Sequence, residues 1–117
     1  MKLSTIIILF VTLAACSNSM QQQEIAANLS FFANDQANAD VMGKWSRSCA
    51  LCHVSGVADA PLVGDTAEWR RRFAQGEDKI IENVLQGINS MPPLGYCMAC
   101  EISDFRAIIG FMAGTNQ

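Results

Sequence analysis

Cys49-Ala50-Leu51-Cys52-His53 is the stretch of this 117-residue chain that decides its fold. Two thiols three positions apart, followed at once by an imidazole, form the C-x-x-C-H pattern by which c-type haem is attached. Each thiol can add across one vinyl group of the haem, and the adjoining imidazole can then bind the iron. His53 is the only histidine in the sequence, so a second iron ligand must be another kind of side chain.

Residues 1–15 have the features of a secretory signal. Lys2 precedes an apolar run from Leu3 to Ala15, which is shorter than the ~20 residues that span a bilayer. Leu13-Ala14-Ala15-Cys16 resembles the lipobox of bacterial lipoproteins, in which the cysteine is lipidated after cleavage. We therefore expect a signal peptide over residues 1–15 and a lipid anchor on Cys16. The alternative is an ordinary cleavable signal, with Cys16 near the cut by chance.

Export sets the expected location and the state of the cysteines. We expect the periplasmic side of a bacterial membrane. The outer membrane is preferred, because Ser17 follows Cys16 where inner-membrane lipoproteins often carry aspartate. Exported chains tend to carry bonded rather than free sulfurs. Of the five cysteines, one would carry lipid and two would carry haem, which leaves Cys97 and Cys100 as a pair.

Composition divides the rest of the chain into a tether and a domain. Residues 16–39 are rich in Gln, Asn, Ala and Ser and contain neither Gly nor Pro, which indicates a hydrophilic tether. Ile25, Leu29 and Phe32 recur at helical spacing, so the tether can contain one short amphipathic helix. Residues 40–117 form the domain, which is near the lower size limit for a self-sufficient core.

The domain pattern predicts an all-α fold of about four short helices joined by long loops. Asp40, Asp65 and Ser103 are expected to cap helices, and no segment shows a convincing strand pattern. The expected helices cover residues 40–48, 65–74 and 78–86, with a last one from residue 103 that turns Phe105, Ile108, Ile109 and Met112 inward. A haem would supply the apolar volume that such a small helical core lacks.

Met91 is the candidate for the second iron ligand. It lies in Asn89-Ser90-Met91-Pro92-Pro93, a loop before the last helix. The two prolines fix φ and stiffen the loop, which suits a weakly binding sulfur, and Met opposite His is a known haem ligation. Met42, Met98 and Met112 fit packing better.

Taken together, C-x-x-C-H after a first helix, Met-Pro-Pro in a late loop and an amphipathic last helix resemble class I cytochrome c. The Met-Pro-Pro segment followed by a second cysteine pair is similar to the small bacterial cytochrome c-five subgroup. The resemblance covers residues 40–113 and implies a disulfide between Cys97 and Cys100. It also implies one haem c, held covalently by Cys49 and Cys52 and ligated by His53 and Met91.

Other positions follow the family pattern by resemblance. Trp45 matches an aromatic residue of the first helix. The Pro61 carbonyl is expected to accept a hydrogen bond from the ligand imidazole, and Trp69 to donate its indole N–H to a haem propionate. One position departs from the pattern. Val41 stands where the family has a glycine that lets the terminal helices cross closely, and Gly43 can replace it only if the crossing shifts.

Three other interpretations stay open. The two cysteine pairs could together bind zinc or iron, although the gap between them is long and an exported chain tends to oxidise its thiols. The second pair could be a thiol–disulfide exchange site, although no βαβ pattern surrounds it. A haem-based sensor or peroxidase would need an open iron position, which Met91 would occupy.

The basic run Arg70-Arg71-Arg72 has two interpretations. It is either a solvated helix face with one propionate contact, or a docking patch for an acidic redox partner. The chain as a whole carries a net charge of −3 and has no basic stripe, which excludes nucleic acid as a partner.

The sequence therefore predicts a membrane-tethered, monohaem c-type cytochrome. It would carry single electrons between redox proteins, have no small-molecule substrate and not be an enzyme.

Overall fold

The computed structural model describes residues 18–28, 30 and 32–115. The predicted signal peptide and Cys16 lie outside these residues. The elements in chain order are α2 (Ala39–Arg47), α3 (Ala50–His53), η1 (Val57–Asp59), α4 (Thr66–Phe73), α5 (Glu77–Gln86), η2 (Pro93–Tyr96) and α6 (Ile102–Ala113). The described residues contain no strand, only an isolated bridge between Ile88 and Met91. The predicted all-α fold is confirmed.

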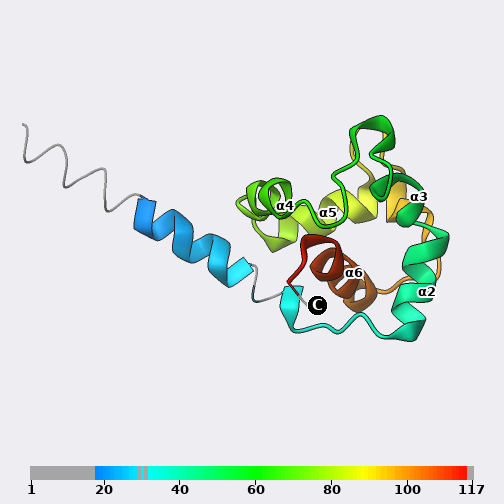
Figure 1. Cartoon of the computed structure of the whole chain (residues 1–117), viewed down its shortest axis with the longest axis horizontal. Helices are drawn as coiled ribbons and strands as arrows, with labels where there is room; N and C mark the ends of the chain where they lie inside the picture. The colour runs from blue at the N-terminus through cyan, green and yellow to red at the C-terminus, as the bar shows by residue number, and fades with distance from the viewer. Residues whose placement is uncertain (1–17, 29, 31, 116–117) are drawn as a thin grey trace, which may run out of the picture.

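Helix α6 lies at the centre of the domain, with α2, α3, α4 and α5 arranged around it (Figure 1). The apolar residues predicted to face inward from this helix are buried: Phe105, Ile108, Ile109 and Met112. Phe111 beside them meets Trp45 of α2 edge to face, with ring centroids 5.0 Å apart. The last helix therefore supplies much of the protein core.

The predicted cap of the last helix, Ser103, is wrong. Glu101 is the N-cap, and it forms a reciprocal capping box with Asp104. The Asp104 carboxylate accepts hydrogen bonds from the Glu101 N–H at 2.8 Å and from Lys44 Nζ of α2 at 2.9 Å. A carboxylate in the first turn also interacts well with the helix dipole. Asp104, in the first turn of α6, thus also connects this helix to α2.

The start of α2 also differs from the prediction. Its N-cap is Asn38, whose Oδ1 accepts a hydrogen bond from the Val41 N–H at 3.1 Å. Asp40, the predicted cap, lies in the first turn and forms an ion pair with Lys44. Asn38 and Asp40 are both good capping residues. The helix begins after Asn38, because its side-chain oxygen is the one that accepts from a free N–H group.

The caps of the middle helices follow the sequence more closely. Asp65 caps α4 as predicted and accepts a hydrogen bond from the Glu68 N–H at 3.1 Å. Helix α5 begins at Glu77 after Gly76, one residue before the predicted Asp78, and ends at Gly87 as predicted.

The structure accommodates Val41 where the family has a glycine. Its side chain is buried in the core, and α2 contacts α6. Gly43 does not take over the role of that glycine, because a Cβ built on it would meet only the Arg47 side chain.

Part of the predicted tether packs on the domain. Residues 18–28, 30 and 32–33 are helical, and this segment projects from the domain in Figure 1. At its domain end Phe32 is fully buried and stacks on Phe73 of α4, with ring centroids 5.0 Å apart. Asn28 Nδ2 donates to the Phe73 carbonyl at 3.0 Å. The tether therefore holds α4 through side chains that precede the predicted boundary at residue 40.

Candidate haem site

A cavity of about 250 Å³ brings together residues that are far apart in the sequence. The segment after α3, helices α4, α5 and α6, and the loop after α5 all contribute to its lining. Five predicted site residues line it: Cys52, His53, Pro61, Trp69 and Met91. The predicted imidazole and thioether ligands therefore face one common space.

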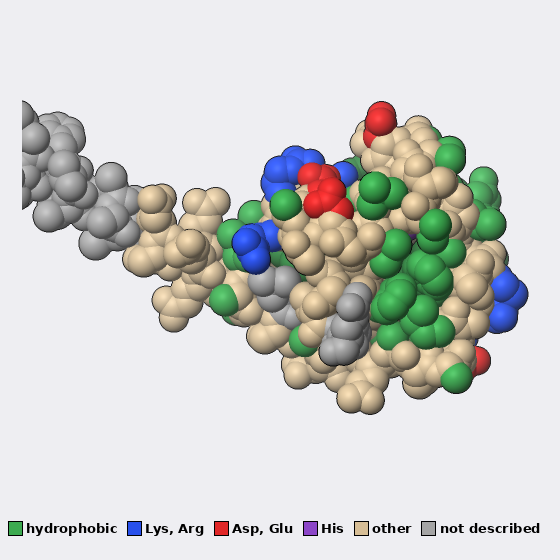
Figure 2. All heavy atoms as spheres, in the orientation of Figure 1, with side chains coloured by type: hydrophobic (Ala, Val, Ile, Leu, Met, Phe, Trp, Pro, Cys, Tyr) green, Lys and Arg blue, Asp and Glu red, His purple; other side chains and the backbone are tan. Residues whose placement is uncertain are grey.

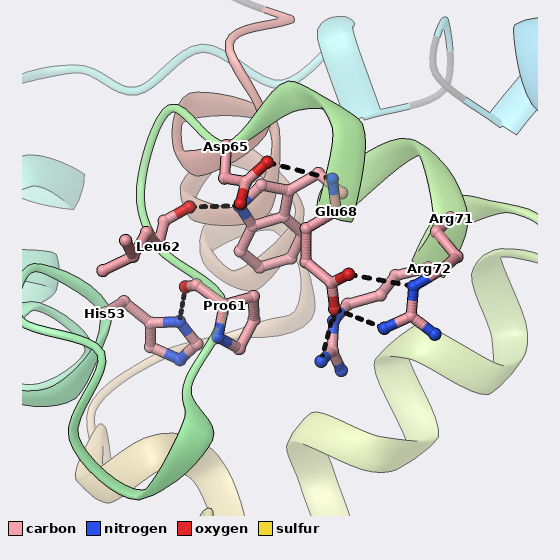
Figure 3. Close-up of polar contacts among 8 residues, drawn as sticks. His53, Pro61, Leu62, Asp65, Glu68, Arg71 and Arg72 are labelled. Carbon is pink, nitrogen blue, oxygen red and sulfur yellow. Dashed lines mark hydrogen bonds and ion pairs between the residues drawn. The ribbon is translucent and has the colours of Figure 1, made fainter.

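His53 ends the short helix α3 and is 95 % buried, at 5 % relative exposure. Its Nδ1 lies 2.7 Å from the Pro61 carbonyl oxygen, as Figure 3 shows. A carbonyl can only accept, so Nδ1 carries the proton and Nε2 keeps its lone pair. Burial, opposed by the Pro61 hydrogen bond and aided by the Arg72 charge, lowers the pKa of His53. The neutral imidazole is the form that binds a metal.

The loop after His53 is held closed by backbone hydrogen bonds. The Val63 N–H donates to the His53 carbonyl at 2.8 Å, and the Gly56 N–H donates to the Cys52 carbonyl at 2.8 Å. Gly56 has a positive φ of 74°, which glycine adopts without strain. These hydrogen bonds keep the Pro61 carbonyl oxygen within hydrogen-bond distance of His53 Nδ1.

Met91 is presented by a tight turn. The Ile88 and Met91 backbones exchange hydrogen bonds of 3.1 and 2.9 Å, and two prolines follow. Gly87 before the turn has a φ of 82°, and a Cβ there would lie 2.7 Å from the Met91 carbonyl oxygen and 2.9 Å from Pro93 N. A side chain at that position would force the backbone of the turn to shift. Gly87 is thus a site-forming residue that the sequence suggested only as a helix stop.

Gly95 of η2 lies close to both Met91 and Cys49. A Cβ on Gly95 would lie 3.4 Å from Met91 Cε and 4.0 Å from Cys49 Sγ. The thioether methyl group and the Cys49 thiol therefore flank one point of the chain. Sequence reasoning did not single out Gly95, although a glycine directly after Met-Pro-Pro-Leu was the available signal.

Cys49 and Cys52 both carry free thiols. Cys52 lines the cavity, whereas Cys49 is buried beside it and is not part of the lining. Burial raises the pKa of the Cys49 thiol, although the Ser48 hydroxyl at 3.5 Å opposes the shift. Cys97 and Cys100 are bonded to each other just before α6, so they cannot join Cys49 and Cys52 in a four-cysteine metal site.

Trp69 lies in the cavity lining, where the resemblance places it, and its indole N–H has a partner within the protein. Its Nε1–H donates to the Leu62 carbonyl at 2.8 Å (Figure 3), and the side chain is buried. The turn between Pro61 and Asp65 brings that carbonyl to the indole. The Trp69 ring lines the cavity and lies 6.0 Å from the His53 ring, centroid to centroid.

The donor set fits a c-type haem. A neutral imidazole and a thioether face one cavity, two free thiols lie at its side, and its walls include the apolar residues Ile80, Val84, Ile109 and Met112. Among the described residues, no group of three or more His, Cys, Asp or Glu side chains could hold a separate metal ion.

Comparison with known proteins gives consistent relatives. Residues 36–112 match the family described as cytochrome c oxidase, cbb3-type, subunit III. The chain is 40% identical over 77 residues to cytochrome c5 of Azotobacter vinelandii, which covers 64% of this chain and 89% of that protein. It is 42% identical over 77 residues to cytochrome c-555 of Chlorobaculum tepidum, covering 62% and 71%.

A solved structure is similar as well. It is the crystal structure of an electron transfer complex of nitrite reductase with cytochrome c, matched at a TM-score of 0.58 and 34% identity. The match covers 68% of this chain and 98% of the chain in that structure.

Proposed function

Because this chain belongs to the cytochrome c family, we propose that it carries single electrons between redox proteins through one haem c that Cys49 and Cys52 hold covalently. The observation that carries the proposal is the common cavity of His53 and Met91, with the His53 Nε2 lone pair left free by the Pro61 hydrogen bond. When bound, the haem supplies a reversible one-electron iron couple.

The protein's own part is to hold the two iron ligands still. Pro61 fixes the tautomer and the ring orientation of His53, as partners behind a metal ligand do. The hydrogen-bonded turn and the prolines after it position Met91. Two rigidly held ligands would keep rearrangement small when the charge of the iron changes, and thioether–imidazole ligation would raise the reduction potential.

This ligand set also supports a carrier rather than an enzyme. With the haem bound, His53 and Met91 would leave no coordination position for a substrate, so a peroxidase or gas sensor would have to displace Met91. The chain has no second histidine to act as an acid or base.

We further propose a lipid anchor on Cys16 and a location on the periplasmic side of a bacterial membrane, the outer one preferred. No helix within the described residues is long and apolar enough to cross a bilayer. Incorporation of radiolabelled palmitate, lost on Cys16→Ser, tests the anchor. Incorporation that persists in the variant would refute it.

The haem proposal is tested on the expressed holoprotein. A pyridine haemochrome spectrum should show one covalently bound haem per chain, and Met91→Ala should remove the weak sulfur-to-iron absorption band while the covalent haem remains. Bound zinc without a Soret band would overturn the proposal. Survival of the sulfur-to-iron band in Met91→Ala would assign the second ligand to another residue.

A further inference from the structure

The second cysteine pair is a reactive group that the proposed function does not use. Cys97 and Cys100 are bonded to each other between η2 and α6. The charged side chains over α4 are, in contrast, already paired: Figure 2 shows acidic and basic groups side by side there, and Arg71 and Arg72 both donate to Glu68. A disulfide can be opened by a thiol, so its place in the chain determines what such an opening would change.

The chain between Met91 and the disulfide is short and folded back on itself. Five residues separate Met91 from Cys97. The Gly95 N–H donates to the Pro92 carbonyl at 3.0 Å, and the Cys97 N–H donates to the Leu94 carbonyl at 2.9 Å. A Cβ on Gly95 would lie 3.4 Å from Met91 Cε. The backbone of η2 thus lies against the thioether, and the position of the Met91 side chain depends on its shape.

The backbone of η2 is strained. Leu94, Gly95 and Tyr96 have consecutive positive φ values of 60°, 53° and 64°. Glycine adopts this left-handed region freely, whereas leucine and tyrosine adopt it at a cost in free energy. Such conformations persist only where the surrounding structure fixes them. Two prolines fix the start of η2, and the disulfide closes the chain directly after it. The disulfide is therefore a covalent restraint on this strained segment.

The disulfide lies where an external thiol can reach it. The loop that it closes contains Met98, which is 81% exposed, and Tyr96 directly before it is 69% exposed. Cys100 is partly buried, whereas Cys97 is only 6% exposed. A thiolate from outside therefore attacks the Cys100 sulfur, and the Cys97 sulfur is the leaving group.

We propose that the Cys97–Cys100 disulfide is a reductive switch that controls whether Met91 stays bound to the haem iron. The inference rests on the proposed function, since it needs Met91 as a ligand. The reductant is a dithiol. One of its thiolates bonds to the Cys100 sulfur and breaks the bond to Cys97; its second thiolate then displaces Cys100. The dithiol becomes a disulfide, its two protons pass to the cysteines, and the oxidation state of the iron does not change.

Opening the bond removes the restraint at the end of η2. Leu94 and Tyr96 can then leave the left-handed region, and the backbone that lies against the Met91 thioether changes shape. Met91 is released from the iron for part of the time, which leaves one coordination position open. An external ligand binds with an apparent affinity in proportion to the open fraction. A dithiol thus converts an electron carrier into a ligand-binding haem protein.

Binding of carbon monoxide to the ferrous holoprotein tests the switch. Ascorbate reduces the iron and leaves the disulfide intact, whereas ascorbate with dithiothreitol also opens the disulfide, so the iron is ferrous in both samples. The apparent affinity for carbon monoxide should be at least about tenfold higher with dithiothreitol. Titration of free thiols should show that two thiols appear per chain, because one disulfide opens.

The double variant Cys97→Ser/Cys100→Ser is the matched control. It should bind carbon monoxide in ascorbate alone as the wild type does with dithiothreitol, and it should not respond to dithiothreitol. If this variant gives no folded holoprotein, hydrogen exchange in the wild type replaces it. The hydrogen-bonded amides of Gly95 and Cys97 should then exchange faster with dithiothreitol than without.

An unchanged affinity for carbon monoxide, measured after the two thiols have appeared, would overturn the switch and leave the proposed function in place. A response of the double variant to dithiothreitol, or unchanged exchange at the two amides, would equally overturn it. Lack of covalent haem, or tight binding of carbon monoxide while the disulfide is intact, would instead refute the proposed haem and ligand set, and the switch with it.

Discussion

The Pro61 carbonyl oxygen accepts a hydrogen bond of 2.7 Å from Nδ1 of His53. The next carbonyl along the chain, that of Leu62, accepts one of 2.8 Å from the Trp69 indole. Consecutive carbonyls are thus both engaged, one by the imidazole and one by the side chain that packs beside it. The loop that orients the His53 ring is therefore fixed by two side-chain hydrogen bonds, from His53 and from Trp69.

Trp69→Phe should destabilise the protein through the loss of one buried hydrogen bond. The change leaves the Leu62 carbonyl without its partner, which costs about 1–3 kcal/mol. The free energy of unfolding, measured in urea, should fall by that amount. Any inflection in the pH dependence of the potential should stay in place, because the indole N–H donates to the Leu62 carbonyl.

Trp45→Phe is the control for that substitution. Trp45 Nε1 is buried and has no hydrogen-bond partner among the described residues, so its loss removes an unsatisfied donor. We expect a smaller stability loss than in Trp69→Phe. An equal loss in both variants would show that ring volume, and not the Leu62 hydrogen bond, explains the effect.

Gly87→Ala should disrupt the proposed ligation by Met91. The new Cβ would lie within 3 Å of two backbone atoms, the Met91 oxygen and Pro93 nitrogen, and backbone atoms cannot rotate away. Gly76→Ala has a nearly equal φ, 86° against 82°, but open space around it. It should show only backbone strain of about 1–3 kcal/mol. The sulfur-to-iron band, read alongside urea unfolding, should weaken in Gly87→Ala alone.

Asp104→Asn should remove a pH-dependent part of the stability. Burial alone would raise the pKa of Asp104, but hydrogen bonds from the Glu101 N–H and Lys44 bring it below its usual 3.8. Such a group stabilises the fold above pH 3.8, and the contribution is lost as the pH falls further. The variant should be less stable near neutral pH by about 1–3 kcal/mol.

The measurement for Asp104→Asn is the free energy of unfolding against pH. The wild-type curve should fall below pH 3.8 more steeply than that of the variant. Asp40→Asn is the control, since this second partner of Lys44 is 73% exposed and such pairs contribute only about 0–1 kcal/mol. Parallel curves for wild type and Asp104→Asn would contradict the assignment.

Phe32→Ala should release the N-terminal helix from α4. The Phe32 ring is fully buried on Phe73, and Phe→Ala in a core costs about 3–5 kcal/mol. The global loss should be smaller, because this helix can open locally. Hydrogen exchange at residues 18–28 should accelerate while the haem spectrum stays unchanged. Met20→Ala, at a side chain 69% exposed, should change neither the exchange rate nor the haem spectrum. Slow exchange in Phe32→Ala would show that Phe32 does not hold the N-terminal helix on α4.

The sequence by itself determined the all-α class, the C-x-x-C-H motif and the cap at Asp65. These features are local: a thiol pair next to an imidazole, the period of apolar residues and a side chain within reach of its own helix start. The predicted caps at Asp40 and Ser103 are wrong, because each lies near another residue that can cap the same helix. Asn38 and Glu101 compete for the same N–H groups, and Asp104 is also drawn to Lys44 from a distant helix.

Only the tertiary structure decided which partners the site residues meet. The indole of Trp69 is committed to Leu62 because a turn brings that carbonyl to it. Arg71 and Arg72 are neighbours in sequence, yet successive residues point about 100° apart around a helix, so one faces solvent and the other the cavity. The positions of Arg71 and Arg72 in the sequence do not predict which of them faces the cavity. The answer depends on how α4 packs against the rest of the domain.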